Sequence, residues 1–166
     1  LPLIVEANKE IYLKRIRLIQ LYEKLETSKT LSLNEHNWLI NLATEYSIEI
    51  KQVHKIVVAK KLLKHVDIIP NSIAIAQAAK ESGWGTSRFA KEGNALFGQW
   101  TYDNSKGLLP NERQNGEVHL VRSFISLKES VNSYMRNLNS HRAYNSFREK
   151  RSDFRENNQF LDPILL

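Results

Sequence analysis

The strongest constraint on the fold is a twelve-residue segment that is apolar on nearly every side. It runs from Ile68 to Ala79 and consists mostly of isoleucine and alanine. Pro70 suits a first helical turn, where the missing N–H needs no partner, and Gly83 suits the left-handed residue that ends many helices. Because a helix without a polar face is buried among other elements, the segment predicts a central, buried helix.

Three amphipathic helices are predicted before this segment, because apolar residues recur there at helical spacing. The second begins at a capping box, in which the hydroxyl of Ser32 and the carboxylate of Glu35 each accept from a free backbone N–H. The third runs from about residue 50 to residue 64. The three apolar stripes are Ile11, Leu18, Tyr22 and Leu25; Trp38, Leu39, Leu42 and Tyr46; and Ile50, Val53 and Val57.

A small β element is predicted between about residues 97 and 124. Asn115 and Gly116 form a strong hairpin-turn signal, and residues 118–124 have the composition of a strand. Another amphipathic helix follows. The order of helices, a small β lobe and further helices predicts an active-site cleft between a helical body and the lobe.

Charge and composition narrow the classes of function. The chain carries 24 Lys and Arg against 18 Asp and Glu, a net charge of +6, which favours an anionic partner. The basic residues are spread along the chain without a dense block, so a nucleic-acid-binding domain is the weaker interpretation. No apolar run reaches the roughly 18 residues that a membrane span needs.

Metal and cofactor sites are not indicated. The chain has no Cys, which excludes disulfides, cysteine-ligated zinc and a cysteine nucleophile. None of the five His shows the spacing of a metal-binding pair, and no Gly-rich phosphate loop is present. We therefore expect no metal and no cofactor.

Glu81 is the most informative single residue. It ends the apolar helix, with Gln77 one turn before it on the same face. Burial and the negative end of the helix dipole would both favour the neutral carboxylic acid, and a neutral acid suits proton donation to a glycosidic oxygen. Most glutamates are exposed, so this pattern alone also fits a solvated residue at a helix end.

Three motifs follow one another in the chain. Residues 76–87 read Ala-Gln-Ala-Ala-Lys-Glu-Ser-Gly-Trp-Gly-Thr-Ser, residues 94–98 read Asn-Ala-Leu-Phe-Gly, and residues 121–130 read Val-Arg-Ser-Phe-Ile-Ser-Leu-Lys-Glu-Ser. In this order they resemble the motifs of the glucosaminidase family of bacterial cell-wall hydrolases, glycoside hydrolase family 73. Residues 67–100 and 137–141 resemble more narrowly the Bax-like proteins of Gram-negative bacteria.

The resemblance implies a mainly α, lysozyme-like α+β fold with a small β-hairpin lobe and extra N-terminal helices. Residues 66–166 would form the catalytic domain, and residues 1–65 a helical region packed on it. The implied activity is that of an endo-β-N-acetylglucosaminidase that cleaves the β-1,4 bond after N-acetylglucosamine, with Glu81 as general acid. We expect a monomer that acts on peptidoglycan glycan strands in the periplasm or cell envelope, although this chain contains no export signal.

A second catalytic carboxylate is implied by the same resemblance, since the family often places one shortly before an Asn-Gly turn. Glu112 matches this position best, Glu117 is its competitor and Asp103 is a poorer third choice. Such a residue would activate water or stabilise an oxocarbenium-like transition state. In a substrate-assisted route the 2-acetamido oxygen attacks instead and Glu112 is dispensable, so inverting, retaining and substrate-assisted mechanisms all stay open.

Aromatic residues are the expected sugar platforms, because a flat ring packs on the apolar face of a pyranose. Trp100 and Tyr102 lie in the predicted β lobe, where a wall of the cleft is expected. For Phe97 and Trp84 we predict core packing or shaping of the cleft.

Polar groups complete the predicted site. Tyr144 would hydrogen-bond the acetamido group or a catalytic water, while Gln77 and Asn94 would orient Glu81 or the sugar. A buried amide is also often a satisfied structural group. The candidate substrate-binding residues are Gln77, Asn94, Phe97, Trp100, Tyr102 and Tyr144.

Two further functions share these features. A lytic transglycosylase has a similar helical Glu-Ser signature and needs no second carboxylate, because the substrate's own hydroxyl attacks. A non-catalytic glycan-binding protein would keep the cleft without turnover, although the intact Glu81 argues against it.

Overall fold

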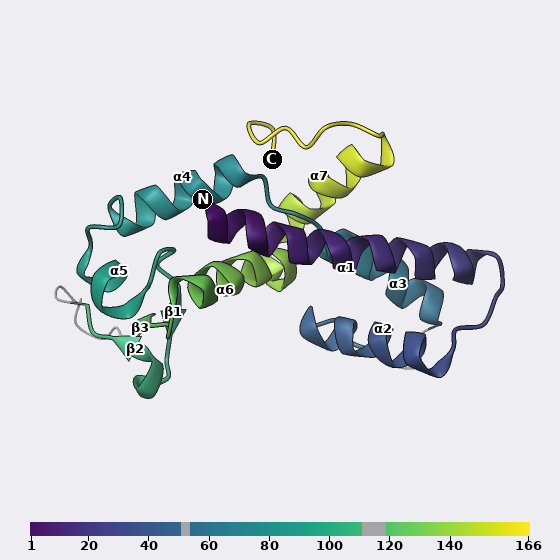
Figure 1. The fold of residues 1–166 in the computed structure, drawn as a ribbon, viewed down its shortest axis with the longest axis horizontal. Helices are drawn as coiled ribbons and strands as arrows, with labels where there is room; N and C mark the ends of the chain where they lie inside the picture. Colours follow the sequence, from purple (N-terminus) through teal and green to yellow (C-terminus); the bar gives the residue numbers. More distant parts are fainter. Residues whose placement is uncertain (51–53, 111–118) are drawn as a thin grey trace. The chain divides into compact units, whose positions relative to one another are not determined.

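The computed structural model describes residues 1–50, 54–110 and 119–166 (Figure 1). Within these residues the chain is mainly helical, with one small three-stranded antiparallel sheet, which confirms the predicted lysozyme-like α+β class. The helices are α1 Pro2–Glu26, α2 Leu33–Glu45, α3 Lys55–His65, α4 Asn71–Ser82, α5 Arg88–Gly93, α6 Leu127–Ser140 and α7 Asn145–Glu156. The strands are β1 Trp100–Thr101, β2 Gly107–Leu108 and β3 Leu120–Arg122, and the 3-10 turns are η1 Asn104–Lys106 and η2 Arg142–Tyr144.

The chain divides into two compact units. The first consists of residues 1–7 and 71–135, and the second of residues 8–70 and 136–166. The sequence analysis divides the chain differently, between residues 65 and 66, into an N-terminal helical region and a catalytic domain. That boundary is based on family resemblance and not on packing, and it stays a prediction.

The first unit contains the β lobe. Its strands pair in the order β1–β3–β2, with Trp100 opposite Val121. Strand β2 begins at Gly107. Glycine fits this position because a Cβ there would overlap the side chain of Leu120. The sheet confirms the small β element predicted in this part of the sequence.

Helix α4 is less buried than its sequence predicts. Ala74 and Ser82 are buried, but Ile75 is 39% exposed, and Gln77 and Glu81 are exposed. Alanine adds little apolar area, so a helix rich in alanine does not need cover on every side. The prediction of a helix buried all round is therefore wrong, and the residues that the structure describes do not enclose Glu81.

The second unit is built on the apolar stripes of α1, α2 and α3. Leu18, Leu39 and Leu62 are completely buried. Val57, which we predicted to lie in the buried stripe of the third helix, is 51% exposed. That prediction is wrong because α3 begins only at residue 55, and it is Val58, with Leu62 one turn later, that faces the core.

The capping box predicted at the start of the second helix is confirmed. Ser32 Oγ accepts from the N–H of Glu35, and the Glu35 carboxylate accepts from the N–H of Ser32 at 2.7 Å. Lys24 Nζ also donates to this carboxylate at 2.8 Å. The hydrogen bond from Lys24, followed by those from Ser32, lowers the pKa of Glu35 to about 2, so the carboxylate is charged and caps the helix at neutral pH.

Candidate active site

Glu81 lies in the last turn of α4, where the chain turns sharply. Gly83 follows with a φ of +56°, the left-handed conformation predicted for it. The hydroxyl of Ser82 donates to the carbonyl of Ala78 at 2.6 Å and accepts from the N–H of Gly85 at 2.8 Å. The Ser in the Glu-Ser signature therefore fixes the turn, while the adjacent carboxyl group stays exposed.

Gly98 brings a backbone segment close to this carboxyl group. A Cβ at position 98 would lie 3.3 Å from Oε2 of Glu81, which is tighter than most Cβ contacts, and the φ of Gly98 is +57°. Both the close approach and the left-handed conformation favour glycine. The Asn-Ala-Leu-Phe-Gly motif thus leaves space beside Glu81 that a side chain would fill.

Tyr134 connects the two motifs from α6. Its ring stacks on Phe97, with ring centroids 3.9 Å apart and an interplanar angle of 10°. Its hydroxyl donates to Oε1 of Gln77 at 2.5 Å. Because the oxygen of the Gln77 amide is engaged by Tyr134, its NH₂ group is the part left to donate to a ligand.

In the sequence, Tyr134 recurs at helical spacing with Val131, Met135 and Leu138, and this pattern indicates only a core position for it. The available signal was its hydroxyl, since a buried tyrosine normally finds a partner for its O–H. Tyr134 is 4% exposed and Phe97 is 9% exposed, so the packing predicted for Phe97 is confirmed. The partner of the Tyr134 hydroxyl is Gln77, which lies one turn before Glu81 on α4.

Asn94 has a structural role in the described contacts. It ends α5 in the left-handed conformation, with a φ of 50°, and its Nδ2 donates to the carbonyl of Phe124 at 3.0 Å. Nearby, the N–H of Leu96 donates to Ser130 Oγ at 3.2 Å. These bonds hold the Asn-Ala-Leu-Phe-Gly segment in place, and a substrate contact by Asn94 stays a prediction.

Three large aromatic side chains of this unit are exposed. Trp100 on β1 is 65% exposed and stacks on His119, with ring centroids 4.1 Å apart. Tyr102 is 74% exposed. Trp84 is 84% exposed, so core packing is wrong for this residue, which lies with a φ of 58° in the exposed turn that follows α4.

The candidates for a second carboxylate are not settled by the fold. Glu112 and Glu117 lie outside the described residues, as does the predicted Asn-Gly turn, and the cleft beside the β lobe stays a prediction with them. Asp103 caps η1: its Oδ1 accepts from the N–H and the hydroxyl of Ser105 at 3.0 and 2.6 Å. These bonds, with Lys106, lower the pKa of Asp103.

Tyr144 belongs to the second unit. It is half-buried in η2, and its ring meets the ring of His141 edge-on, with centroids 6.4 Å apart. A contact of Tyr144 with the substrate stays a prediction.

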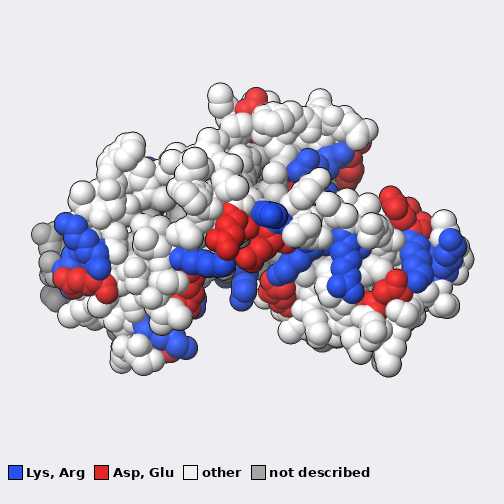
Figure 2. Space-filling view, viewed as in Figure 1, with Lys and Arg blue, Asp and Glu red and all other residues white. Residues whose placement is uncertain are grey.

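One face of the protein shows charges of both signs. On the face drawn in Figure 2, basic and acidic side chains alternate rather than separate into one-sign regions. In the described ranges, no group of three His, Asp or Glu residues has the arrangement of a metal site. None of the helices in those ranges has the length and apolar character required to cross a membrane.

Comparison with known proteins gives two matches. The family profile "Glucosaminidase", described as mannosyl-glycoprotein endo-beta-N-acetylglucosaminidase, matches residues 56–163. The chain is also similar to Protein bax of Escherichia coli (strain K12), with 36% identity over 159 residues, which is 96% of this chain and 55% of that protein. The chain thus spans about half the length of the curated relative it matches. No solved structure matches it.

Proposed function

This chain belongs to the glucosaminidase family as a Bax-like member, and from this premise we propose that it is a peptidoglycan hydrolase. It cleaves the β-1,4 bond after N-acetylglucosamine, as an endo-β-N-acetylglucosaminidase. The observation that carries the proposal is the carboxyl group of Glu81, exposed in the last turn of α4 and bordered by the backbone of Gly98. A carboxyl group that is accessible and has open space beside it can reach a glycosidic oxygen.

Glu81 is the general acid in this proposal. Since the described part of the protein leaves it exposed, the bound glycan strand must displace water from the carboxyl group, and this desolvation favours the neutral acid. The acid then protonates the leaving oxygen as the glycosidic bond breaks. Gln77, held through its amide oxygen by Tyr134, donates its N–H to the sugar.

The charge that develops on the sugar needs a second group. We propose Glu112 as the carboxylate that activates water, with Glu117 as its competitor. Asp103 is a poor choice because its oxygens are engaged by Ser105 and Lys106. In the substrate-assisted route the acetamido oxygen of the substrate attacks instead of an activated water, and neither Glu112 nor Glu117 is needed.

The exposed rings of Trp100 and Tyr102 suit the walls of a sugar-binding groove. The proposed site of action is the periplasm or cell envelope, the proposed partner is the peptidoglycan glycan strand, and the proposed catalytic form is a monomer. The site of action and the partner follow from the substrate that the family implies.

The experiment is digestion of purified peptidoglycan with mass analysis of the products. We expect fragments with N-acetylglucosamine at the reducing end. Anhydro ends would instead identify a lytic transglycosylase, and binding without release of fragments would identify a glycan-binding protein. Comparing Glu112→Gln with Glu117→Gln identifies the second carboxylate, and full activity in both favours the substrate-assisted route.

A further inference from the structure

The second unit contains a cavity that no step of the proposed hydrolysis uses. Its volume is about 390 Å³, and residues of α1, α3 and α7 line it. Four of the lining residues are basic: Arg15, Lys60, Lys64 and Arg155. Only Glu156 among the lining residues is acidic, so four cations face one carboxylate.

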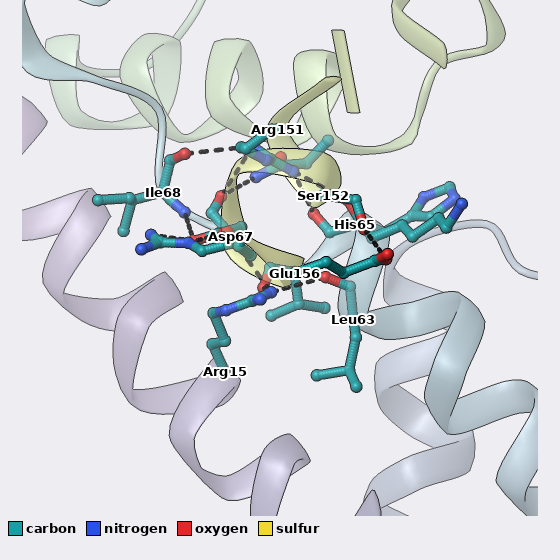
Figure 3. A network of polar contacts seen from close by, with 12 residues as sticks. Arg15, Leu63, His65, Asp67, Ile68, Arg151, Ser152 and Glu156 are labelled. Carbon is teal, nitrogen blue, oxygen red and sulfur yellow. Dashed lines mark hydrogen bonds and ion pairs between the residues drawn. The ribbon is translucent and has the colours of Figure 1, made fainter. Parts of the chain in front are cut away.

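Arg15, which lines the cavity, also belongs to a buried polar network around Asp67 (Figure 3). The buried carboxylate of Asp67 accepts from Nε and Nη2 of Arg155 at 2.8 and 3.0 Å. Nη1 of Arg15 lies 3.5 Å from Oδ2 of the same carboxylate. A third guanidinium, that of Arg151, donates to the backbone carbonyl of Asp67 at 3.2 Å. Two guanidinium groups therefore share this one carboxylate, and a third lies against the backbone of the same residue.

Burial above all, and the neighbouring guanidinium groups to a lesser extent, disfavour the charged forms of Arg15 and Arg151. Burial lowers the pKa of Arg15, and the neighbouring Arg155 lowers it further, against the attraction of Asp67. Burial likewise lowers the pKa of Arg151 to about 10, with added repulsion from the surrounding arginines. An anion entering the cavity, which Arg15 and Arg155 line, would reduce the repulsion between these two guanidinium groups.

The two lysines are available for such an anion. Lys60 and Lys64 are exposed, one turn apart on α3, and neither forms an ion pair with any residue that the structure describes. Like charges at this spacing repel each other on a helix. Both line the same cavity, where one negative group can interact with the two ammonium groups.

The remaining lining residues indicate the kind of anion. Leu63 and the ring of Tyr22 supply apolar surface, and the hydroxyl of Ser152 donates to Oε1 of Glu156 at 3.1 Å. The Glu156 carboxylate repels a compact dianion such as phosphate but accepts from an N–H group. A ligand with a carboxylate, an N–H and a small apolar group meets all of these surfaces.

We propose that this cavity binds a short peptide through its terminal carboxylate. The basic side chains of Lys60, Lys64 and Arg155 contact the carboxylate, and Glu156 accepts from an N–H of the ligand. The volume suits a dipeptide, since small-ligand sites begin at about 300 Å³.

The test is titration calorimetry of the chain with alanylalanine, its C-terminal amide and inorganic phosphate. We expect the dipeptide to bind with a dissociation constant of about 1 mM, and the amide and phosphate at least about tenfold more weakly. The double variant Lys60→Gln, Lys64→Gln is expected to weaken dipeptide binding by at least about tenfold. Lys61→Gln is the matched control, since Lys61 is exposed on the same helix but does not line the cavity.

Three results would overturn the proposal: equal binding of acid and amide, tighter binding of phosphate than of dipeptide, or an equal loss of affinity in the control and the double variant. All three substitutions change exposed side chains, and circular dichroism of the two variants checks that each remains folded. The binding measurement does not depend on glycosidase activity, so it stands or fails separately from the proposed hydrolysis.

Discussion

Replacing Gly98 with alanine tests the contact between the two family motifs. The new Cβ would lie 3.3 Å from Oε2 of Glu81, so the carboxyl group must shift by a few tenths of an ångström. A misplacement of about 1 Å costs on the order of 100-fold in rate. A shift of this smaller size is then expected to lower kcat/KM roughly threefold to tenfold.

The control is Gly85→Ala. Gly85 also has a positive φ, +78°, but a Cβ there would meet nothing within 4 Å. Both variants force alanine into the left-handed region, at a cost of about 1–2 kcal/mol, so both midpoints of thermal unfolding should fall by about 2–8 °C. Only Gly98→Ala also crowds Glu81.

The assay compares initial rates of reducing-end release from soluble peptidoglycan with unfolding midpoints of the same samples. We expect the two variants to lose similar stability and Gly98→Ala alone to lose activity. Equal kcat/KM in the two variants would refute the idea that Gly98 is needed to leave room for the carboxyl group.

Three further predictions concern hydrogen bonds and charges inside the two units. Tyr134→Phe removes the hydrogen bond to Gln77 but keeps the ring stack, so unfolding in urea should show a loss of about 1 kcal/mol, and Tyr102→Phe, on an exposed ring, should show none. Asp67→Asn leaves the surrounding guanidinium groups without their carboxylate, and the same measurement should show a loss of about 3–5 kcal/mol; a loss under about 1 kcal/mol would contradict the pairing. Burial, followed by the charge of Arg148, lowers the pKa of His65 to about 4, whereas the unfolded state binds the proton near pH 6.5. Stability should therefore fall as the pH drops from about 6.5 to about 4, by about 1–2 kcal/mol after allowance for partial exposure, and this decrease should be absent in His65→Leu.

Local signals in the sequence predicted much of the fold. The capping box at Ser32 and the helix end at Gly83 depend on a few neighbouring residues, and both are confirmed. The β lobe follows from composition over a short range. Such features are set by hydrogen bonds and backbone preferences within one turn, which a single sequence records directly.

Features that depend on distant residues were not predictable in this way. The exposure of Gln77 and Glu81 reflects which face of α4 finds a packing partner, and the apolar composition of that helix does not specify it. The hydroxyl of Tyr134 reaches Gln77 across 57 positions in the chain. The three arginines around Asp67 come from α1 and α7, at opposite ends of the chain, and in the sequence they are only part of a dispersed basic charge.

Glu81 as proton donor is tested most directly by the rate of peptidoglycan cleavage in Glu81→Gln. The matched control is Glu92→Gln, another exposed glutamate of the same unit. We predict a loss of at least about 100-fold for Glu81→Gln, near wild-type activity for the control, and unchanged unfolding midpoints in both. Wild-type cleavage by Glu81→Gln would contradict the assignment.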